Sequence, residues 1–165
     1  MEIRRATVED AEAIRAIYNA EVVESTHTFD LVPRTAEQQV DWLLQRSGAY
    51  AVIVATDEDG TVVGFASLSP YRERPAYSTT VENSVYVDRD RQAAGIGRAL
   101  LEELIATATA HGFHTMIARI VGGHAASIAL HEKVGFKVVG TEFQVGRKMG
   151  KWLDVVVMQH LLGRA

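Results

Sequence analysis

A glycine-bearing turn between a strand and a helix is the stretch of this sequence best suited to bind an anion. Residues 81–87 alternate as a strand, and the apolar residues that begin at Ile96 recur at helical spacing, with Gly95 and Gly97 at the junction. Glycine lets the backbone approach a ligand, and the free N–H groups and dipole of the first helical turn point at whatever binds there. The pattern predicts a phosphate site, although such a turn also occurs without a ligand.

The turn differs from the two best-known phosphate loops. It has no Gly-Lys-Ser/Thr, so the nucleoside-triphosphate loop does not fit. A third glycine and a later acidic ribose ligand are missing, so the dinucleotide fingerprint fails as well. The remaining pattern is Gln92-x-x-Gly95-x-Gly97, placed after a strand and before an amphipathic helix.

Glu82 is the candidate for proton transfer because a carboxylate inside an apolar strand needs an explanation. Alternation places Glu82 and Ser84 on one face of the strand and Asn83 on the other. Burial in a cleft raises the pKa of a carboxylate toward the range in which it can take a proton from an amine. Two interpretations stay open: a general base, or a structural acid paired with a nearby arginine.

Two histidines share one side of a short predicted helix. His124 and His131 are seven residues apart, which places them within about 20° of the same face. A metal pair lacks a third ligand at suitable spacing, so two ordinary polar residues are the alternative. Histidine titrates near neutrality and can donate a proton to a leaving group. The chain has no cysteine, which excludes a thiol nucleophile and cysteine-based zinc sites.

Together with the glycine turn, four stretches resemble the GCN5-related N-acetyltransferase superfamily, and within it the phosphinothricin N-acetyltransferases, which include methionine sulfone and sulfoximine acetyltransferases. The stretches are residues 17–19 (IYN), 80–87 (TVENSVYV), 125–136 (AASIALHEKVGF) and 145–154 (VGRKMGKWLD). The resemblance implies acetyl-CoA as co-substrate and no metal. It implies transfer of acetyl to the α-amino group of an amino acid or analogue such as phosphinothricin, methionine sulfoximine or methionine sulfone, by direct attack in a ternary complex.

The resemblance also assigns roles by position. Glu82 would be the base, and His131, where the superfamily usually has tyrosine, would protonate the thiolate. A bulge would splay the strand of residues 81–87 from its neighbour and expose main-chain groups to the coenzyme. The implied coenzyme contacts are Val85, Tyr86, Val87, Gln92, Ala93, Ala94, Gly95, Ile96, Gly97, Arg98 and His124. The implied acceptor contacts are Arg72, Arg74, Glu82, Asn83 and Ser84.

Two departures from the family pattern affect the coenzyme. His124 stands where the family generally has asparagine, and imidazole can replace that amide contact only in the right tautomer. Gln92-Ala93-Ala94-Gly95 stands where relatives commonly carry Arg-Gly-x-Gly. The loss of a glycine and of a basic side chain is expected to weaken coenzyme affinity, while the backbone donors survive.

The acceptor class follows from charge placement. An α-amino acid presents a carboxylate that a forked guanidinium binds in bidentate fashion, and Arg72-Glu73-Arg74 enters the strand of Glu82. A solvated charged loop is the alternative. Two other functions stay open, an acetyltransferase for another amine or a protein N-terminus, and a non-catalytic coenzyme A-binding domain. By resemblance we expect a homodimer with Lys148 and Trp152 near the contact.

The elements that position these residues form an α/β pattern. The 165 residues suit one domain, 1–165, with a mostly antiparallel seven-stranded sheet of the GCN5-related fold and about four helices. The predicted strands are 3–6, 50–56, 61–69, 81–87, 115–121, 136–144 and 152–161, and the predicted helices are 8–23, 36–46, 96–111 and 125–133. The net charge of −4 without a basic patch argues against nucleic acid, and the apolar runs are too short for a membrane span. A cytoplasmic protein is expected.

Overall fold

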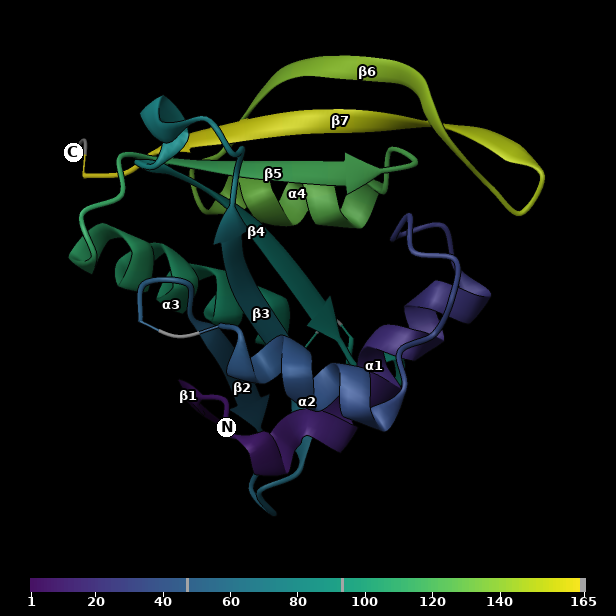
Figure 1. Cartoon of the computed structure of the whole chain (residues 1–165), viewed down its shortest axis with the longest axis vertical. Coiled ribbons are helices and arrows are strands. Elements are labelled where there is room, and N and C mark those ends of the chain that lie inside the picture. The colour runs from purple at the N-terminus through teal and green to yellow at the C-terminus, as the bar shows by residue number, and fades with distance from the viewer. Residues whose placement is uncertain (47, 93, 164–165) are drawn as a thin grey trace.

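One mixed sheet organises the computed structural model, which describes residues 1–46, 48–92 and 94–163. Its seven strands lie in the order β1-β2-β3-β4-β5-β7-β6, and only the β4–β5 pair is parallel (Figure 1). The strands are β1 Glu2–Arg5, β2 Val52–Thr56, β3 Val62–Pro70, β4 Thr80–Val87, β5 Thr115–Val121, β6 Lys137–Lys148 and β7 Lys151–Leu161. The mostly antiparallel seven-stranded α/β fold predicted from the sequence is confirmed.

Four α-helices accompany the sheet: α1 Ala11–Glu24, α2 Ala36–Leu44, α3 Ile96–Ala110 and α4 Ala125–Lys133. Short 3-10 turns lie at Val8–Asp10, Pro75–Tyr77 and Arg89–Arg91. None of the helices in the described ranges has the length and apolarity needed to cross a membrane.

The helices cover the sheet in two layers, because the central strands are apolar on both faces. Along β2, Val52 and Val54 join the cluster under α1 and α2, whereas Ile53 and Ala55 join the cluster under α3. This period of two is what a strand between two layers requires. In Figure 1, α3 and α4 lie on one side of the sheet, and α1 and α2 lie on the other.

Glycine in the left-handed region marks both ends of α3. Gly95 is the N-cap with φ 79°, and Gly112, with φ 82°, follows the C-cap residue His111. A side chain with a Cβ is strained in this region, so both positions favour glycine. The predicted helix stop at Gly112 is confirmed.

The parallel strands β4 and β5 separate soon after they begin. Their pairing covers only Thr80 to Glu82 of β4 against Thr115 to Ile117 of β5, and beyond this point the strands diverge. The expected splay is therefore present. The expected bulge is not, because the β3–β4 register runs without a shift from Gly64 opposite Val87 to Pro70 opposite Val81. Beyond Glu82, no strand within the described ranges pairs with the edge of β4 that faces β5.

The C-terminal hairpin is longer than predicted. β6 was expected to end at Gln144 but continues to Lys148, with an irregular register between Glu142 and Gly146. Gln144 has φ 50°, and this local kink lets the strand resume after the point where the alternation fails. Met149 and Gly150 both have positive φ, as two-residue hairpin turns require.

The loop between α1 and α2 packs against this hairpin. The buried Lys148 Nζ donates hydrogen bonds to the carbonyl oxygens of Thr28 at 2.9 Å and Glu21 at 3.4 Å. The ring of Phe29 covers Gly146 so closely that a Cβ there would lie 2.3 Å from Phe29 Cζ. The hairpin and the loop therefore close one side of the molecule together.

Gly146→Ala is expected to destabilise the fold, because the added methyl group must displace the Phe29 ring. Overpacking of this kind costs about 1–3 kcal/mol. For a chain of this size, that lowers the melting temperature by roughly 2–10 °C, measured by circular dichroism. Gly140→Ala is the matched control in the same strand, since a Cβ there meets nothing within 4 Å. Equal melting temperatures for the two variants would contradict this packing.

Candidate active site

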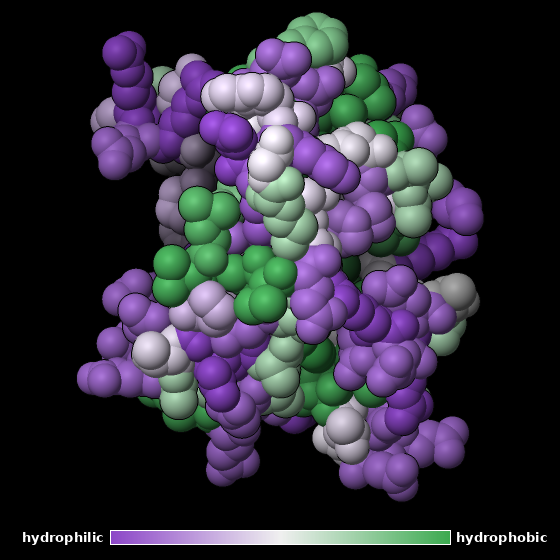
Figure 2. All heavy atoms as spheres, turned by 90° about the vertical axis from the view of Figure 1, so that its right-hand side faces the viewer, coloured by the Kyte–Doolittle hydropathy of each residue, from purple (hydrophilic) through white to green (hydrophobic). Residues whose placement is uncertain are grey.

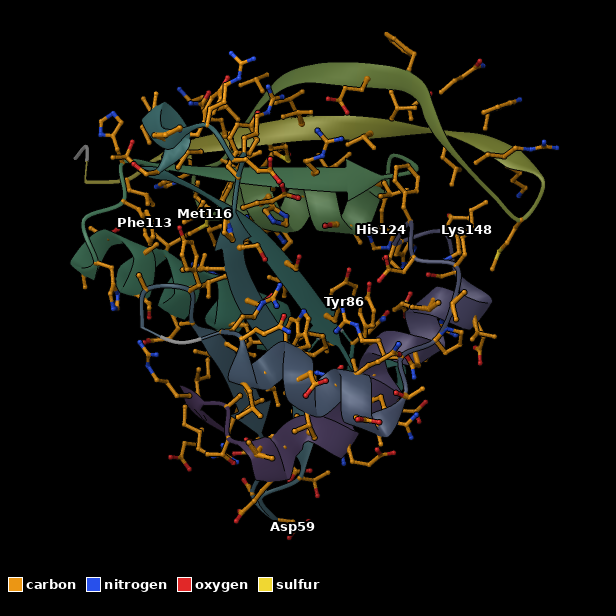
Figure 3. The ribbon with its side chains drawn as sticks, in the orientation of Figure 1. Asp59, Tyr86, Phe113, Met116, His124 and Lys148 are labelled. Atoms are coloured by element: carbon orange, nitrogen blue, oxygen red, sulfur yellow. The ribbon has the colours of Figure 1, made fainter. Side chains whose placement is uncertain are left out.

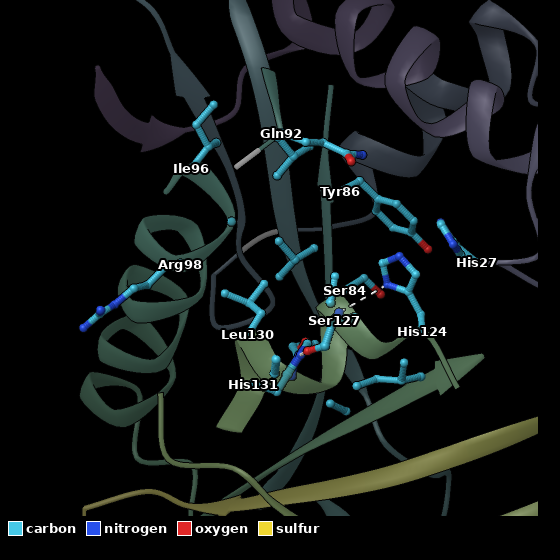
Figure 4. Close-up of a pocket in the computed structure, with 18 of the residues that line it drawn as sticks. His27, Ser84, Tyr86, Gln92, Ile96, Arg98, His124, Ser127, Leu130 and His131 are labelled. Carbon is cyan, nitrogen blue, oxygen red and sulfur yellow. Dashed lines mark hydrogen bonds between the residues drawn. The ribbon is translucent and has the colours of Figure 1, made fainter. Parts of the chain in front are cut away.

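A cavity of about 630 Å³ opens where β4 and β5 separate. Its volume lies within the range typical of small-molecule sites. The second halves of both strands, the start of α3 and one side of α4 line it, together with Glu21 and His27 from α1 and the loop after it (Figure 4). Figure 3 shows Tyr86 near the middle of the molecule, with His124 and Lys148 toward the hairpin side.

The cavity brings together most of the residues selected from the sequence. Those lining it are Asn83, Ser84, Val85, Tyr86, Val87, Gln92, Gly95, Ile96, Gly97, Arg98, His124 and His131. Of the other selected residues that the structure describes, Glu82, Arg72, Arg74 and Ala94 are not among the lining. Ala93 lies outside the described residues.

The anion-binding end of the cavity is the first turn of α3. Its first backbone hydrogen bond runs from Ala99 N–H to Gly95 O at 3.0 Å, which leaves the N–H groups of the first three helical residues, 96–98, without an intrahelical acceptor. A Cβ on Gly97 would lie 3.2 Å from Leu130 Cδ2, so glycine lets α3 pack closely against α4. Among the described residues these three N–H groups have no backbone acceptor, and three such donors at a helix N-terminus suit a phosphate.

The Arg98 side chain runs along the helix instead of toward the middle of the cavity. Its Nε donates to Glu102 Oε1 at 2.8 Å, and both side chains are more than half exposed. Figure 4 shows the guanidinium directed away from the other labelled residues. Arg98 therefore offers the cavity its main-chain N–H more directly than its charge.

His124 has one tautomer fixed by its position before α4. The Ser127 N–H donates to His124 Nδ1 at 3.3 Å, so a neutral ring carries its proton on Nε2. Burial lowers the pKa of His124, and the neighbouring His27, whose ring centroid is 3.9 Å away, lowers it further. The neutral ring therefore presents an Nε2–H donor, which can bond an amide oxygen as an asparagine N–H would.

Glu82 is the last residue of β4 that pairs with β5, opposite Ile117. Burial raises the pKa of Glu82, and the positive charge of Arg119 opposes that rise. Within the described part of the chain, Glu82 makes no side-chain hydrogen bond and no ion pair. The interpretation of Glu82 as a structural acid requires an arginine in contact with its carboxylate, and no arginine among the described residues makes that contact.

His131 is almost fully buried, and both of its ring nitrogens have protein neighbours. Nδ1–H donates to the Ser127 carbonyl oxygen at 2.8 Å, and Nε2 lies 3.0 Å from Asn83 Oδ1. A ring that donates to both oxygens carries two protons and a charge. Burial lowers the pKa of His131 and opposes this charged form, while the Ser127 carbonyl favours it. The protonation state of His131 is therefore coupled to the orientation of the Asn83 amide.

Asn83 lies on the face of β4 opposite Glu82, as the alternation predicted. Besides its contact with His131, its Nδ2 donates to the Ile117 carbonyl oxygen at 3.3 Å. The side chain thus bridges β4 and β5 at the point where they part. Asn83 is directed toward α4 and away from the face that carries Glu82.

The two arginines selected for the acceptor lie on the exposed connection between β3 and β4. The guanidinium of Arg72 stacks on the rings of Tyr71 and Tyr77, with its carbon 4.9 Å and 5.5 Å from the two centroids. This arrangement holds Arg72 at the surface.

Sequence reasoning missed Arg119, which does line the cavity. The signal was available, since Arg119 is a charge inside the apolar run 115–121, just as Glu82 is in its own strand.

The donor set of the site contains no metal-type cluster. Across the described ranges, no group of three or more His, Asp or Glu side chains is arranged to hold a metal ion.

Comparison with known proteins gives one consistent family. Residues 3–157 match the family described as Acetyltransferase (GNAT) domain. An L-methionine sulfoximine/L-methionine sulfone acetyltransferase from Pseudomonas paraeruginosa is 42% identical over 158 residues, covering 95% of this chain and 92% of that protein. A phosphinothricin N-acetyltransferase from Streptomyces coelicolor is 40% identical, covering 94% of this chain and 92% of that protein.

Solved structures agree with these relatives. A phosphinothricin acetyltransferase from Sinorhizobium meliloti in complex with acetyl-CoA has a TM-score of 0.95 at 39% identity, covering 98% of this chain and 88% of that one. A structure described as a ribosomal-protein-alanine N-acetyltransferase from Brucella melitensis also has a TM-score of 0.95, at 42% identity, covering 98% of this chain and all of that one.

Proposed function

Because the chain belongs to the GNAT family of acetyltransferases, we propose that it acetylates the α-amino group of a small amino-acid-like acceptor. The chain is an acetyl-CoA-dependent N-acetyltransferase. One observation carries the proposal: a single cavity joins the free N–H groups of α3 to the point beside Glu82 where β4 and β5 separate. Methionine sulfone, methionine sulfoximine and phosphinothricin are the acceptors to try first, because the relatives are named for them.

The coenzyme would enter with its diphosphate on the first turn of α3. Ile96, Gly97 and Arg98 would donate their N–H groups to the phosphate oxygens. The pantetheine arm would then follow the unpaired edge of β4 from Val87 toward Val85, as an added strand uses free main-chain groups. His124 would donate Nε2–H to an amide oxygen of this arm.

Glu82, which lies beside the other end of the cavity but not in its lining, would act as the general base. An amine is protonated near pH 7 and must lose its proton before it attacks a thioester. Glu82 would take that proton directly or through water, and the neutral nitrogen would attack the acetyl carbon. The carbonyl oxygen then gains negative charge, for which a main-chain N–H on the free edge of β4 is the available donor. Collapse of the tetrahedral intermediate breaks the carbon–sulfur bond and releases the thiolate, and the acetylated nitrogen gives its remaining extra proton to water.

His131 would return a proton to the departing thiolate. The ring lines the cavity, and its Nε2 is held by Asn83 at 3.0 Å. Donation therefore requires the Nε2–Asn83 contact to open as the sulfur leaves. Direct transfer from acetyl-CoA to the amine needs no acyl-enzyme, in keeping with the absence of cysteine.

The C-terminal hairpin would form a homodimer contact. Large apolar side chains stand exposed on it: Val138, Val139, Phe143, Val145, Met149 and Trp152. Figure 2, which views the side of the molecule at the hairpin tip, shows a mostly hydrophilic face interrupted by apolar patches. Lys148 is buried within its own chain, so Trp152 is the better candidate for the contact. Sedimentation equilibrium should give a dimer that Phe143→Asp and Trp152→Asp together convert to a monomer, whereas a monomeric wild type would end this part of the proposal.

We also propose that the enzyme works in the cytoplasm, where acetyl-CoA is supplied. Fractionation of the producing cells, with detection of the enzyme in the cytoplasmic fraction, tests it. Recovery from the medium or periplasm would contradict it.

Thiol release from acetyl-CoA with a panel of acceptors tests the proposed activity. The panel contains methionine sulfone, methionine sulfoximine, phosphinothricin, a polyamine and a peptide that begins with alanine. The peptide is included because the Brucella melitensis structure is described as a ribosomal-protein-alanine N-acetyltransferase. We expect the free amino acids to be turned over fastest, with one acetyl group on the α-nitrogen by mass spectrometry. Preference for the peptide would move the function to protein N-termini.

The coenzyme loop gives a separate prediction. Gly95→Val should raise the KM for acetyl-CoA about tenfold, because a left-handed residue with a Cβ costs about 1–2 kcal/mol and the turn will relax away from it. Gly112→Val is the matched control at the far end of α3, with φ 82° and equally open surroundings. It should lower stability to a similar extent and leave the KM for acetyl-CoA unchanged. If Gly95→Val and Gly112→Val had the same KM for acetyl-CoA, the turn at Gly95 would have no specific role in coenzyme binding.

A further inference from the structure

Arg119 of β5 lines the cavity and has no part in the chemistry described above. It is the first residue beyond Ile117 on the same face of β5, and Ile117 is the residue that pairs with Glu82. The guanidinium therefore stands where the two strands begin to part, on the side that carries Glu82. Its side chain is 31% exposed, so it is partly desolvated but accessible.

A carboxylate from β6 holds this guanidinium in place. Arg119 Nη1 donates to Glu142 Oε1 at 2.9 Å, and Nη2 donates to Glu142 Oε2 at 2.6 Å. This end-on pair uses two of the five N–H donors of arginine. No acceptor for the Nε–H appears within the described part of the chain, so the side-on edge of Nε and Nη is available to a second carboxylate.

Charges of both signs act on the pair of Arg119 and Glu142. Glu82 and Glu142 supply two carboxylates, and Arg119 and Arg72 supply two guanidinium groups. The hydrogen bonds from Arg119 lower the pKa of Glu142, with a further contribution from the charge of Arg72. Such a balanced set complements a zwitterion, which brings one ammonium and one carboxylate, better than it complements a polyamine.

We propose that Arg119 determines acceptor specificity by binding the α-carboxylate of the acceptor through its free side-on edge, while Glu142 fixes the guanidinium. The acceptor amine is then directed toward Glu82 on the neighbouring strand. The inference rests on the proposed function, because it presupposes an amino-acid acceptor. Arg119 fits this role better than Arg72 and Arg74, because it lines the cavity and those two lie on the exposed connection.

The test compares L-methionine sulfone with its methyl ester, at saturating acetyl-CoA, in wild type and Arg119→Gln. The variant should raise the KM for the acid about tenfold or more and leave kcat nearly unchanged, since a charge-assisted pair of hydrogen bonds is lost. The methyl ester has no carboxylate, so its KM should change less than about twofold. For each protein, the kcat/KM for the acid is divided by the kcat/KM for the ester. Comparison of this ratio between wild type and Arg119→Gln cancels the greater intrinsic reactivity of the ester.

Three further variants keep the inference falsifiable. Arg119→Lys should recover only part of the preference for the acid, because an ammonium lacks the planar fork. Glu142→Gln should keep part of the preference, because the guanidinium remains but loses the carboxylate that fixes it. Arg15→Gln, which removes a similar bidentate partner of Glu12 on α1, should match wild type. Melting temperatures establish that each variant is folded.

Equal losses for acid and ester in Arg119→Gln, or an unchanged KM for the acid, would overturn the inference. If Arg119→Gln does not fold, an acid preference in Arg119→Lys as large as that of wild type would do so. Failure of the proposed function looks different. In that case wild type itself would turn over no free α-amino acid, whatever stands at residue 119.

Discussion

Glu82→Gln is expected to lower kcat with an amino-acid acceptor by a factor of about 10²–10⁴, the range that positioned general bases contribute. Glutamine keeps the size and hydrogen-bonding capacity of the side chain but cannot take a proton from the ammonium group. The Kd for acetyl-CoA should be unaltered, because Glu82 is not among the residues lining the cavity. Steady-state kinetics and calorimetry on the same preparation check both statements.

The pH dependence gives the more specific form of this prediction. A base works only when ionised, so the wild-type rate falls as the pH drops through the pKa of Glu82. Burial raises this pKa above the ordinary value of 4.5 for glutamate, which moves the acidic limb toward neutrality. Glu82→Gln should lack this limb and keep only the alkaline dependence that belongs to the acceptor amine. If the acidic limb of the pH–rate profile persisted in Glu82→Gln, Glu82 would not be the base. The control is Glu73→Gln, on the exposed loop, which should keep the wild-type profile.

His131→Phe is expected to slow the chemical step by a factor of about 10². The phenyl ring fills the same space but cannot protonate the thiolate. Single-turnover measurements with enzyme-bound acetyl-CoA separate this step from binding, and the Kd for acetyl-CoA should change little. Because His131 bonds the Ser127 and Asn83 oxygens, the substitution also removes two side-chain hydrogen bonds and should lower the melting temperature.

A second variant distinguishes catalysis from folding at this position. His131→Gln can still donate hydrogen bonds but cannot become an acid near neutral pH, so it should be more stable than His131→Phe and equally slow. His114→Phe, at an exposed site, should behave as wild type. If either His131 variant weakened acetyl-CoA binding while the single-turnover rate stayed normal, the general-acid role would be wrong.

The local features of this fold could be predicted from local signals. Gly95 and Gly112 bracket α3 because each provides the left-handed conformation that its turn requires, and glycine is visible in any sequence. The two faces of β4 followed from alternation, which correctly separated Glu82 from Asn83. These signals extend over a few residues, and their physical cause lies within the same few residues.

The missing features depend on contacts between distant segments. Arg119 and Glu142 are 23 residues apart in the sequence. Their side chains meet across β7, which lies between β5 and β6 in the sheet, and the order of the strands along the chain does not specify this arrangement. The continuation of β6 to Lys148 depends on a kink at Gln144, which interrupts the alternation used to find strands. Likewise, the contact between the tilted rings of His27 and His124 joins the loop after α1 to the start of α4. The burial of Lys148 by the loop after α1 is a contact of the same kind, and the expectation that Lys148 lies near a dimer contact stays a prediction.

The crystal structure of the binary complex with acetyl-CoA tests the central claim most directly. We predict the diphosphate within hydrogen-bonding distance of the N–H groups of Ile96, Gly97 and Arg98. We predict the thioester between the separated strands, on the side of Glu82 and Arg119. A diphosphate bound elsewhere, or a cavity that stays empty in crystals grown with millimolar acetyl-CoA, would contradict the account.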